Sequence, residues 1–308
     1  SSREGMRFAL LCLWLPLALS AQDTRALGEQ LQAIEQNSGG VLGVSGIHIE
    51  RMLQVGWHAR DRFPMMSVYK LPIAIRALSM VEAGLLPYRK WISVQPEDVA
   101  PGHNPLMEGY PEGRVLTVGQ LLEAMVSQSD NTACDVLLKH IGGPPAVHGL
   151  MQRIVKDGIR VDRSEKEMDA DFQKLGHQGY DADGRDSSTP EAMSLLLMQL
   201  HRGAILKPKT LDLLKRWMTE SPTGPNRIKG LLPKDVVVWH KTGTGWLKDG
   251  ISLATNDAGV MVLPEGRGHI AVTVFLKLST KDEATRERAL AEAALAVYRF
   301  FDTPQPAK

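Results

Sequence analysis

The chain contains the stretch 67-SVYKLPIAIRAL-78, in which a serine and a lysine stand three residues apart at the start of an apolar run. On a helix, residues i and i+3 share a face, so the side-chain nitrogen of Lys70 can reach the hydroxyl oxygen of Ser67. A serine hydroxyl is a poor nucleophile at neutral pH and needs a group that accepts its proton. The stretch therefore predicts a nucleophilic serine with a lysine partner on a buried helix. Alone the spacing is weakly specific, because both residue types are common.

Two later segments add polar groups that suit a ligand site. Ser129-Asp130-Asn131 lies between two helical patterns and would present a hydroxyl and an amide on a turn that faces a cleft. Lys241-Thr242-Gly243-Thr244-Gly245 follows the strand-like run 236-VVVWH-240. A cation and hydroxyls on a strand edge, with glycines that allow close backbone approach, suit a ligand carboxylate.

Hydrophobic periodicity predicts strands near both ends of the chain and helices between them. The expected strands are 41–49, 51–58, 236–241, 253–263 and 269–278, and the expected helices are 24–37, 117–127, 131–141, 145–156, 190–202, 207–219 and 284–301. Thr117 is the expected N-cap of its helix. This order predicts an α/β fold, with one sheet completed by both termini and a helical second lobe. The groove between the lobes is the natural place for a site.

The composition is that of a soluble globular protein with a large core. The 308 residues are 43% hydrophobic and 23% charged, with a formal net charge of +1. Without residues 1–21 the charge becomes 0, since Arg3, Arg7 and Glu4 leave together. Nothing in this balance favours a nucleic-acid or membrane-surface partner.

The N-terminus predicts export. Met6-Arg7 forms a short basic region, the apolar run 8–19 is too short for an ordinary membrane span, and small residues follow before Ala21. We expect residues 1–21 to be a signal peptide, in which residues 1–5 precede the initiator Met6, and residues 22–308 to be a periplasmic catalytic domain without a membrane anchor. A buried N-terminal helix is the alternative. Of the two cysteines, Cys12 leaves with the signal, and Cys134 is expected to be a small buried residue.

The motifs S-x-x-K, S-D-N and K-T-G, in this order, resemble those of class A β-lactamases and penicillin-binding proteins. The resemblance implies a two-lobed fold, with an antiparallel sheet flanked by terminal helices (about 22–63 and 230–308) and an all-helical lobe (about 64–229). It implies that Ser67 is acylated, that Lys70 accepts its proton and that Ser129 relays a proton to the lactam nitrogen. By the same resemblance, Asn131 binds the substrate's amide, Lys241, Thr242 and Thr244 bind its carboxylate, and the backbone N–H groups of Ser67 and Thr244 form the oxyanion hole.

A β-lactamase must also hydrolyse its acyl-enzyme. Arg163-Ser164-Glu165 resembles the family's R-x-E element, which makes Glu165 the expected base, although the base for acylation is left open between Lys70 and Glu165. The segment 165–186 resembles the family's omega loop, closed by an ion pair between Arg163 and Asp186 and lengthened around 175–184. Asp169 stands where the family usually has a water-positioning Asn. Its like charge is expected to raise the pKa of Glu165 or its own.

Several segments resemble the extended-spectrum branch typified by the PER and VEB enzymes: 129–135, 227–233 and 255–259. In this alignment Arg227 supplies a positive charge near the substrate carboxylate, and His103 stands at the mouth of the site. The chain is thus expected to be a monomeric serine β-lactamase that confers resistance to penicillins and cephalosporins. The alternative is a D,D-peptidase or penicillin sensor that acylates without efficient release. No cofactor is expected. No metal is expected either, because the histidines show no H-x-H or H-E-x-x-H spacing.

Overall fold

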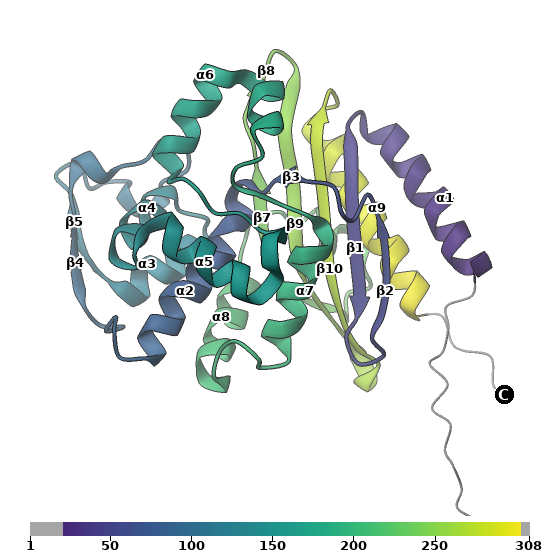
Figure 1. Ribbon diagram of the computed structural model, residues 1–308, viewed down its shortest axis with the longest axis horizontal. Coiled ribbons are helices and arrows are strands. Elements are labelled where there is room, and N and C mark those ends of the chain that lie inside the picture. Colours follow the sequence, from purple (N-terminus) through teal and green to yellow (C-terminus); the bar gives the residue numbers. More distant parts are fainter. Residues whose placement is uncertain (1–20, 303–308) are drawn as a thin grey trace, which may run out of the picture.

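The computed structural model describes residues 21–302, and its centre is one antiparallel sheet (Figure 1). The strand order is β2-β1-β10-β9-β7, with β8 paired to β9. The strands are β1 (Val41–His48), β2 (Leu53–Trp57), β7 (Val237–Thr244), β8 (Leu247–Lys248), β9 (Ile251–Leu263) and β10 (Gly268–Ser279). Both ends of the chain therefore contribute to the sheet, as expected.

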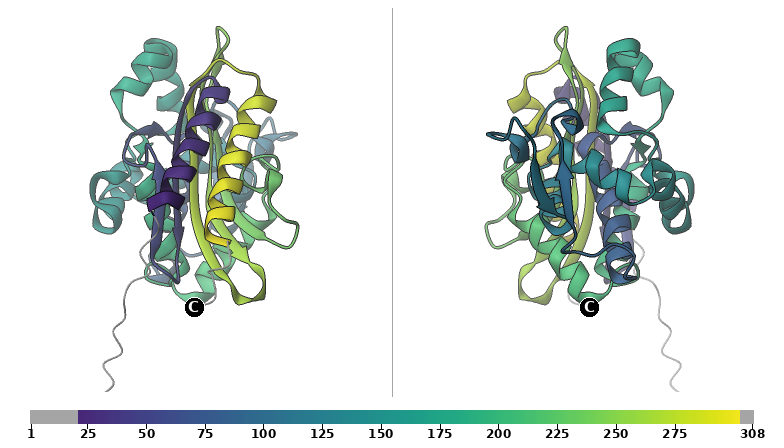
Figure 2. Two further views of the ribbon diagram at one scale, coloured as in Figure 1. Left: turned by 90° about the vertical axis from the view of Figure 1, so that its right-hand side faces the viewer. Right: turned by 90° about the vertical axis from the view of Figure 1, so that its left-hand side faces the viewer.

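Two helices cover one face of this sheet. They are α1 (Ala21–Ser38) and α9 (Glu283–Asp302), which lie side by side in Figure 2. Leucines of α1, alanines of α9 and the strand residues that face them form a closed apolar cluster. Most of the predicted signal peptide lies outside the described residues, as does Cys12.

The other face carries the second lobe, which is mostly helical. Its helices are α2 (Lys70–Glu82), α3 (Val118–Ser127), α4 (Asn131–His140), α5 (Gly143–Val155), α6 (Glu165–Asp183), α7 (Pro190–His201) and α8 (Pro208–Glu220). Two short antiparallel strand pairs accompany them: β3 (Phe63–Pro64) with β6 (Ser187–Ser188), and β4 (Trp91–Val94) with β5 (Arg114–Thr117). Thr117 caps α3 as predicted, because its side chain accepts a hydrogen bond from the Gln120 N–H. In the described part of the chain, no helix combines the length and apolar character needed to cross a membrane.

The segment 165–186, which resembles the family's omega loop, is largely the helix α6, interrupted at Gly176 (φ 67°, ψ −174°). The run before Gly176 has no glycine or proline, Ser164 caps it by accepting from the Glu167 N–H, and Glu165 and Glu167 place acidic groups in its first turn. Each of these features stabilises a helix.

Candidate active site

Ser67 lies on a tight turn that runs directly into the central helix. The turn is the 3₁₀ segment Met66–Tyr69, and Lys70 is the first residue of α2. Met66 adopts a φ of 51°, a costly left-handed conformation for a side chain of its size. The turn leaves Ser67 Oγ 3.0 Å from Lys70 Nζ. The expected pair is thus present, but the serine belongs to the turn rather than to the α-helix.

Lys70 is fully buried and connects the turn to α4 and α6. Its Nζ donates to the Ser129 carbonyl at 2.8 Å and to Asn131 Oδ1 at 2.6 Å. It also lies 3.5 Å from Glu165 Oε1. Ser129 itself takes a left-handed φ of 59°, and Asp130 caps α4, which together aim the Ser129-Asp130-Asn131 turn at Lys70.

The hydroxyl of Ser129 lies between two lysine nitrogens. Lys241 Nζ donates to Ser129 Oγ at 3.0 Å, and Lys70 Nζ approaches the same oxygen at 3.2 Å. Burial, and then the nearby charge of Lys70, lowers the pKa of Lys241 well below its ordinary value. A hydroxyl held between two amines can receive a proton from one side and pass it on from the other.

The strand β7 approaches the serine turn very closely at Gly243. A Cβ placed there would lie 2.6 Å from the Met65 carbonyl oxygen and 2.9 Å from the Ser67 nitrogen. Only glycine fits such an approach without a shift of the backbone. This contact puts the backbone of β7 against the N–H of Ser67.

Arg227 lies behind β7, and all three nitrogens of its guanidinium group have hydrogen-bond partners. Its Nη1 donates to the carbonyls of Gly243 and Asn256 at 3.0 Å, and its Nη2 donates to Thr244 Oγ1 at 2.8 Å. Its Nε pairs with Glu287 Oε2 at 3.0 Å. Arg227 thus supplies positive charge under the end of β7 and fixes the Thr244 hydroxyl.

Glu165 is a buried carboxyl with an unusual environment. Burial raises its pKa, the charge of Lys70 opposes that rise, and the like charge of Asp135 adds to it. Asp135 accepts the backbone N–H of Glu165 at 2.7 Å and that of Lys166 at 3.1 Å, which fixes the start of α6. Its own pKa is also raised, chiefly by burial.

Asp169 contacts an aromatic side chain at the wall of the site. The like charge that raises the pKa of Glu165 is that of Asp135, whereas Asp169 Oδ1 accepts a hydrogen bond from Trp246 Nε1 at 3.1 Å. The indole of Trp246 also stacks on Phe172, with ring centroids 4.4 Å apart. One wall of the site is therefore an aromatic contact between α6 and the turn after β7.

These groups line a common cleft of about 420 Å³. The lining includes Ser67, Ser129, Asn131, Glu165, Asp169, Arg227, Thr242, Thr244, Trp246 and His103. His103 stands beside Asn131, whose backbone N–H donates to the His103 carbonyl at 2.9 Å and whose amide donates to the Pro101 carbonyl at 2.8 Å. Lys70 and Lys241 lie beneath the lining and reach the cleft through Ser67 and Ser129.

Comparisons with known proteins identify the family. The Beta-lactamase enzyme family matches residues 26–301. The chain belongs to this family. It is 32% identical to Beta-lactamase VEB-1 of Pseudomonas aeruginosa, with 95% of this chain and 96% of that protein covered. It is 34% identical to Extended-spectrum beta-lactamase PER-1 of the same organism, with 93% and 92% covered.

Solved structures of the family place the fold in the same class. A β-lactamase from Chitinophaga pinensis superposes with a TM-score of 0.82 at 35% identity, with 90% of this chain and 98% of that chain covered. The TLA-1 extended-spectrum β-lactamase gives a TM-score of 0.82 at 31% identity, with 90% and 99% covered. The chain is a class A serine β-lactamase, and the two-lobed fold predicted from the motifs is confirmed.

In this β-lactamase the two ends of the α6 segment are joined by a buried ion pair. Arg163 Nε lies 2.7 Å from Asp186 Oδ2, and both side chains are almost fully buried. Arg163 Nη1 also pairs with Asp171 at 2.9 Å, and the guanidinium stacks over the ring of Tyr180 at 4.6 Å. The predicted pair is therefore present, and it connects to α6 itself.

The structure brings further residues to the β-lactamase site. Asp135 stands four residues after Asn131 on α4, a helical spacing that would have placed both on one face. Trp246 directly follows the Lys241–Gly245 motif. Thr223 hydrogen-bonds the Thr242 hydroxyl at 2.8 Å, and no spacing in the sequence indicates that contact.

Proposed function

We propose that this β-lactamase opens the β-lactam ring of penicillins and cephalosporins through an acyl-enzyme on Ser67. The observation that carries the proposal is the chain of contacts Ser67–Lys70–Ser129–Lys241, in which both lysines are buried and both serines line the cleft. Ser67 Oγ attacks the lactam carbonyl carbon and its proton passes to Lys70 or, through water, to Glu165. As the carbon–nitrogen bond breaks, Ser129 delivers a proton to the lactam nitrogen.

The substrate is held at the end of β7. Lys241, Thr242 and Thr244 bind its carboxylate, and Arg227 adds positive charge behind them. Asn131 binds the side-chain amide, with His103 at the mouth of the cleft. The backbone N–H groups of Ser67 and Thr244 stabilise the oxyanion, which is supported by the close approach at Gly243.

Release of the acyl group requires a base and a held water. Glu165 takes the proton of the water that attacks the acyl carbonyl, and Asp169 helps to position that water. Oε1 of Glu165 supports this role, because it is buried 3.5 Å from Lys70 Nζ and makes no closer hydrogen bond among residues 21–302. The ion pair of Arg163 and Asp186 closes the segment that carries both carboxylates.

The relatives suggest a wider substrate range. PER-1 and TLA-1 are named extended-spectrum enzymes. We infer that third-generation cephalosporins are substrates here too. The enzyme works in the periplasm as a monomer, after residues 1–21 have been removed. Its catalytic domain, residues 22–308, has two lobes. One lobe combines about 22–63 with 230–308, and the other comprises about 64–229. The enzyme confers resistance to these antibiotics.

The test is turnover by the purified mature protein. We expect many cycles of hydrolysis with a chromogenic cephalosporin and with benzylpenicillin, measured as steady-state rates beside a third-generation cephalosporin and a carbapenem. A D,D-peptidase or a sensor would give one stoichiometric burst with penicillin and then stop. A burst without turnover would overturn the proposal.

Asp135→Asn is expected to shift the acid limb of the profile of kcat against pH to lower pH. A base works only when ionised, so the limb follows the pKa of Glu165, which the charge of Asp135 raises. Removing that charge lowers this pKa. The measurement is kcat against pH with a substrate whose deacylation limits the rate.

Asp169→Asn is the matched control for this shift. It also removes one carboxylate charge from the wall of the cleft, but from a group directed at Trp246. Its acid limb should move less than that of Asp135→Asn. Equal shifts in the two variants would show that the charge of Asp135 has no special effect on Glu165.

A further inference from the structure

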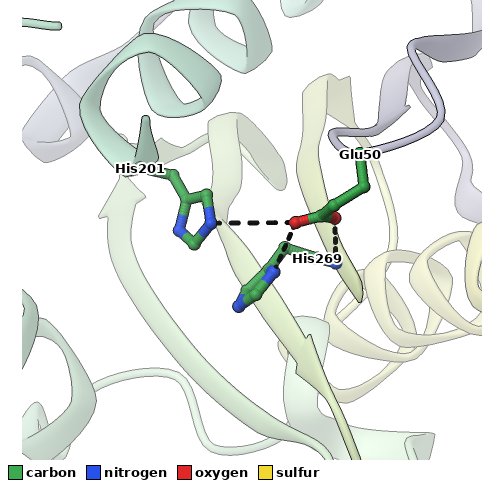
Figure 3. Close-up of side chains that lie close together, drawn as sticks. All are labelled: Glu50, His201 and His269. Carbon is green, nitrogen blue, oxygen red and sulfur yellow. Dashed lines mark hydrogen bonds and ion pairs between the residues drawn. The ribbon is translucent and has the colours of Figure 1, made fainter. Parts of the chain in front are cut away.

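Three potential metal ligands converge at the end of the sheet away from the cleft (Figure 3). Glu50 lies in the turn after β1, His201 ends α7, and His269 is the second residue of β10. His269 pairs with Val262 at the end of β9, whereas the cleft lies where β7 pairs with residues 255–258. The three segments are far apart in sequence, so no spacing motif predicts the cluster.

The three ligand atoms are close enough to share one ion. Glu50 Oε2 lies 2.8 Å from His269 Nδ1 and 4.0 Å from His201 Nε2, and all three atoms lie within 4.8 Å of one another. Ligands at about 2.0–2.2 Å from a tetrahedral zinc ion lie about 3.4 Å apart. One of the two distances is shorter and the other longer than that value, so small side-chain rotations would bring the three ligand atoms to tetrahedral spacing.

Two of the side chains are held in place before any ion binds. The other oxygen of Glu50, Oε1, accepts the backbone N–H of His269 at 2.7 Å, which orients the carboxylate. The ring of His201 lies over that of His269, with centroids 4.0 Å apart, and against Trp239 of β7. Neighbouring His48 is not available, because Arg267 O and the Arg51 N–H occupy its two nitrogens.

His201 lacks the partners that a histidine in a protein usually has. Its Nδ1 is buried without a hydrogen bond in the described part of the chain, and its Nε2 faces Glu50 beyond hydrogen-bonding distance. Nε2 is therefore open to an ion that Glu50 and His269 would share. The positive charges of Lys215 and Arg202 repel a bound cation, which weakens the affinity of the cluster for a metal ion.

We propose that Glu50, His201 and His269 bind a divalent transition-metal ion of the zinc type, with water completing the coordination. Two imidazoles and one carboxylate suit such an ion better than calcium or magnesium, which prefer oxygen ligands. The ion ties the end of α7 to the ends of β1 and β10, and so joins the helical lobe to the sheet. It stabilises the fold and takes no part in hydrolysis.

The test is calorimetric titration of the mature, tag-free protein with zinc chloride. The wild type should bind one zinc ion per chain, and zinc should raise its melting temperature. His201→Gln and Glu50→Gln should each weaken binding at least tenfold and abolish the thermal shift. His140→Gln, which removes a half-buried histidine outside the cluster, should behave as wild type.

The variants separate a metal site from general damage to the fold. Glu50→Gln keeps an oxygen that can accept the His269 N–H, so it should fold even if His201→Gln does not. Turnover of a chromogenic cephalosporin should be the same with zinc and with a chelator. Absence of zinc binding by the wild type, equal binding by Glu50→Gln, or zinc-dependent turnover would each overturn the proposal.

Discussion

Ser67→Ala is expected to abolish hydrolysis of penicillins and cephalosporins. Loss of the nucleophile should lower kcat by at least about 10⁴-fold, the scale found when a catalytic serine is removed. Lys70 keeps its contacts with Ser129 and Asn131 in this variant, so the site should stay assembled. Steady-state rates measure the loss, and intact-protein mass spectrometry with benzylpenicillin should show no acylated species.

Ser79→Ala is the matched control on the same helix. Its hydroxyl donates to the Ile75 carbonyl within α2 and does not line the cleft. This variant should retain wild-type turnover and should acylate normally. Residual acylation of Ser67→Ala would mean that another residue is the nucleophile.

Glu165→Gln should stop the reaction one step later. Glutamine preserves the shape of the side chain but cannot take a proton from water, so the acyl group on Ser67 should remain. General-base catalysis contributes about 10²–10⁴-fold, and deacylation should slow by that amount. Mass spectrometry should show the protein enlarged by one intact penicillin, with a burst of stoichiometric amplitude in the chromogenic assay.

Glu167→Gln provides the comparison for this trap. Glu167 shares the first turn of α6 but is exposed, and only its backbone N–H contacts the cap Ser164. Its turnover should match the wild type. Normal turnover of Glu165→Gln would remove Glu165 from the mechanism and leave the base of deacylation to another group.

Local patterns predicted much of this molecule. The period of the apolar residues predicted the sheet strands and the helices around them, and Thr117 was identified as a cap from its type and place. The Ser67–Lys70 spacing predicted a contact that the structure contains. These features depend on residues close in sequence, for which local backbone geometry alone determines the side-chain contacts.

Features that depend on tertiary packing could not be predicted in this way. Asp135 accepts a hydrogen bond from the backbone of Glu165, 30 residues away in sequence, and its like charge raises the pKa of Glu165. The helix α6 was not predicted either, because the resemblance indicated only a lengthened loop over 165–186. The cluster of Glu50, His201 and His269 joins three segments that only the fold brings together.

The aromatic stack of Trp246 on Phe172 bears on how this enzyme can evolve. It joins α6, which carries Glu165 and Asp169, to the turn that follows β7. A substitution that widened the cleft at Trp246 would also disturb the position of α6, and one in α6 would disturb Trp246. Adaptation to bulkier antibiotics should therefore proceed through compensating pairs of mutations at this contact, and the order in which they arise should matter.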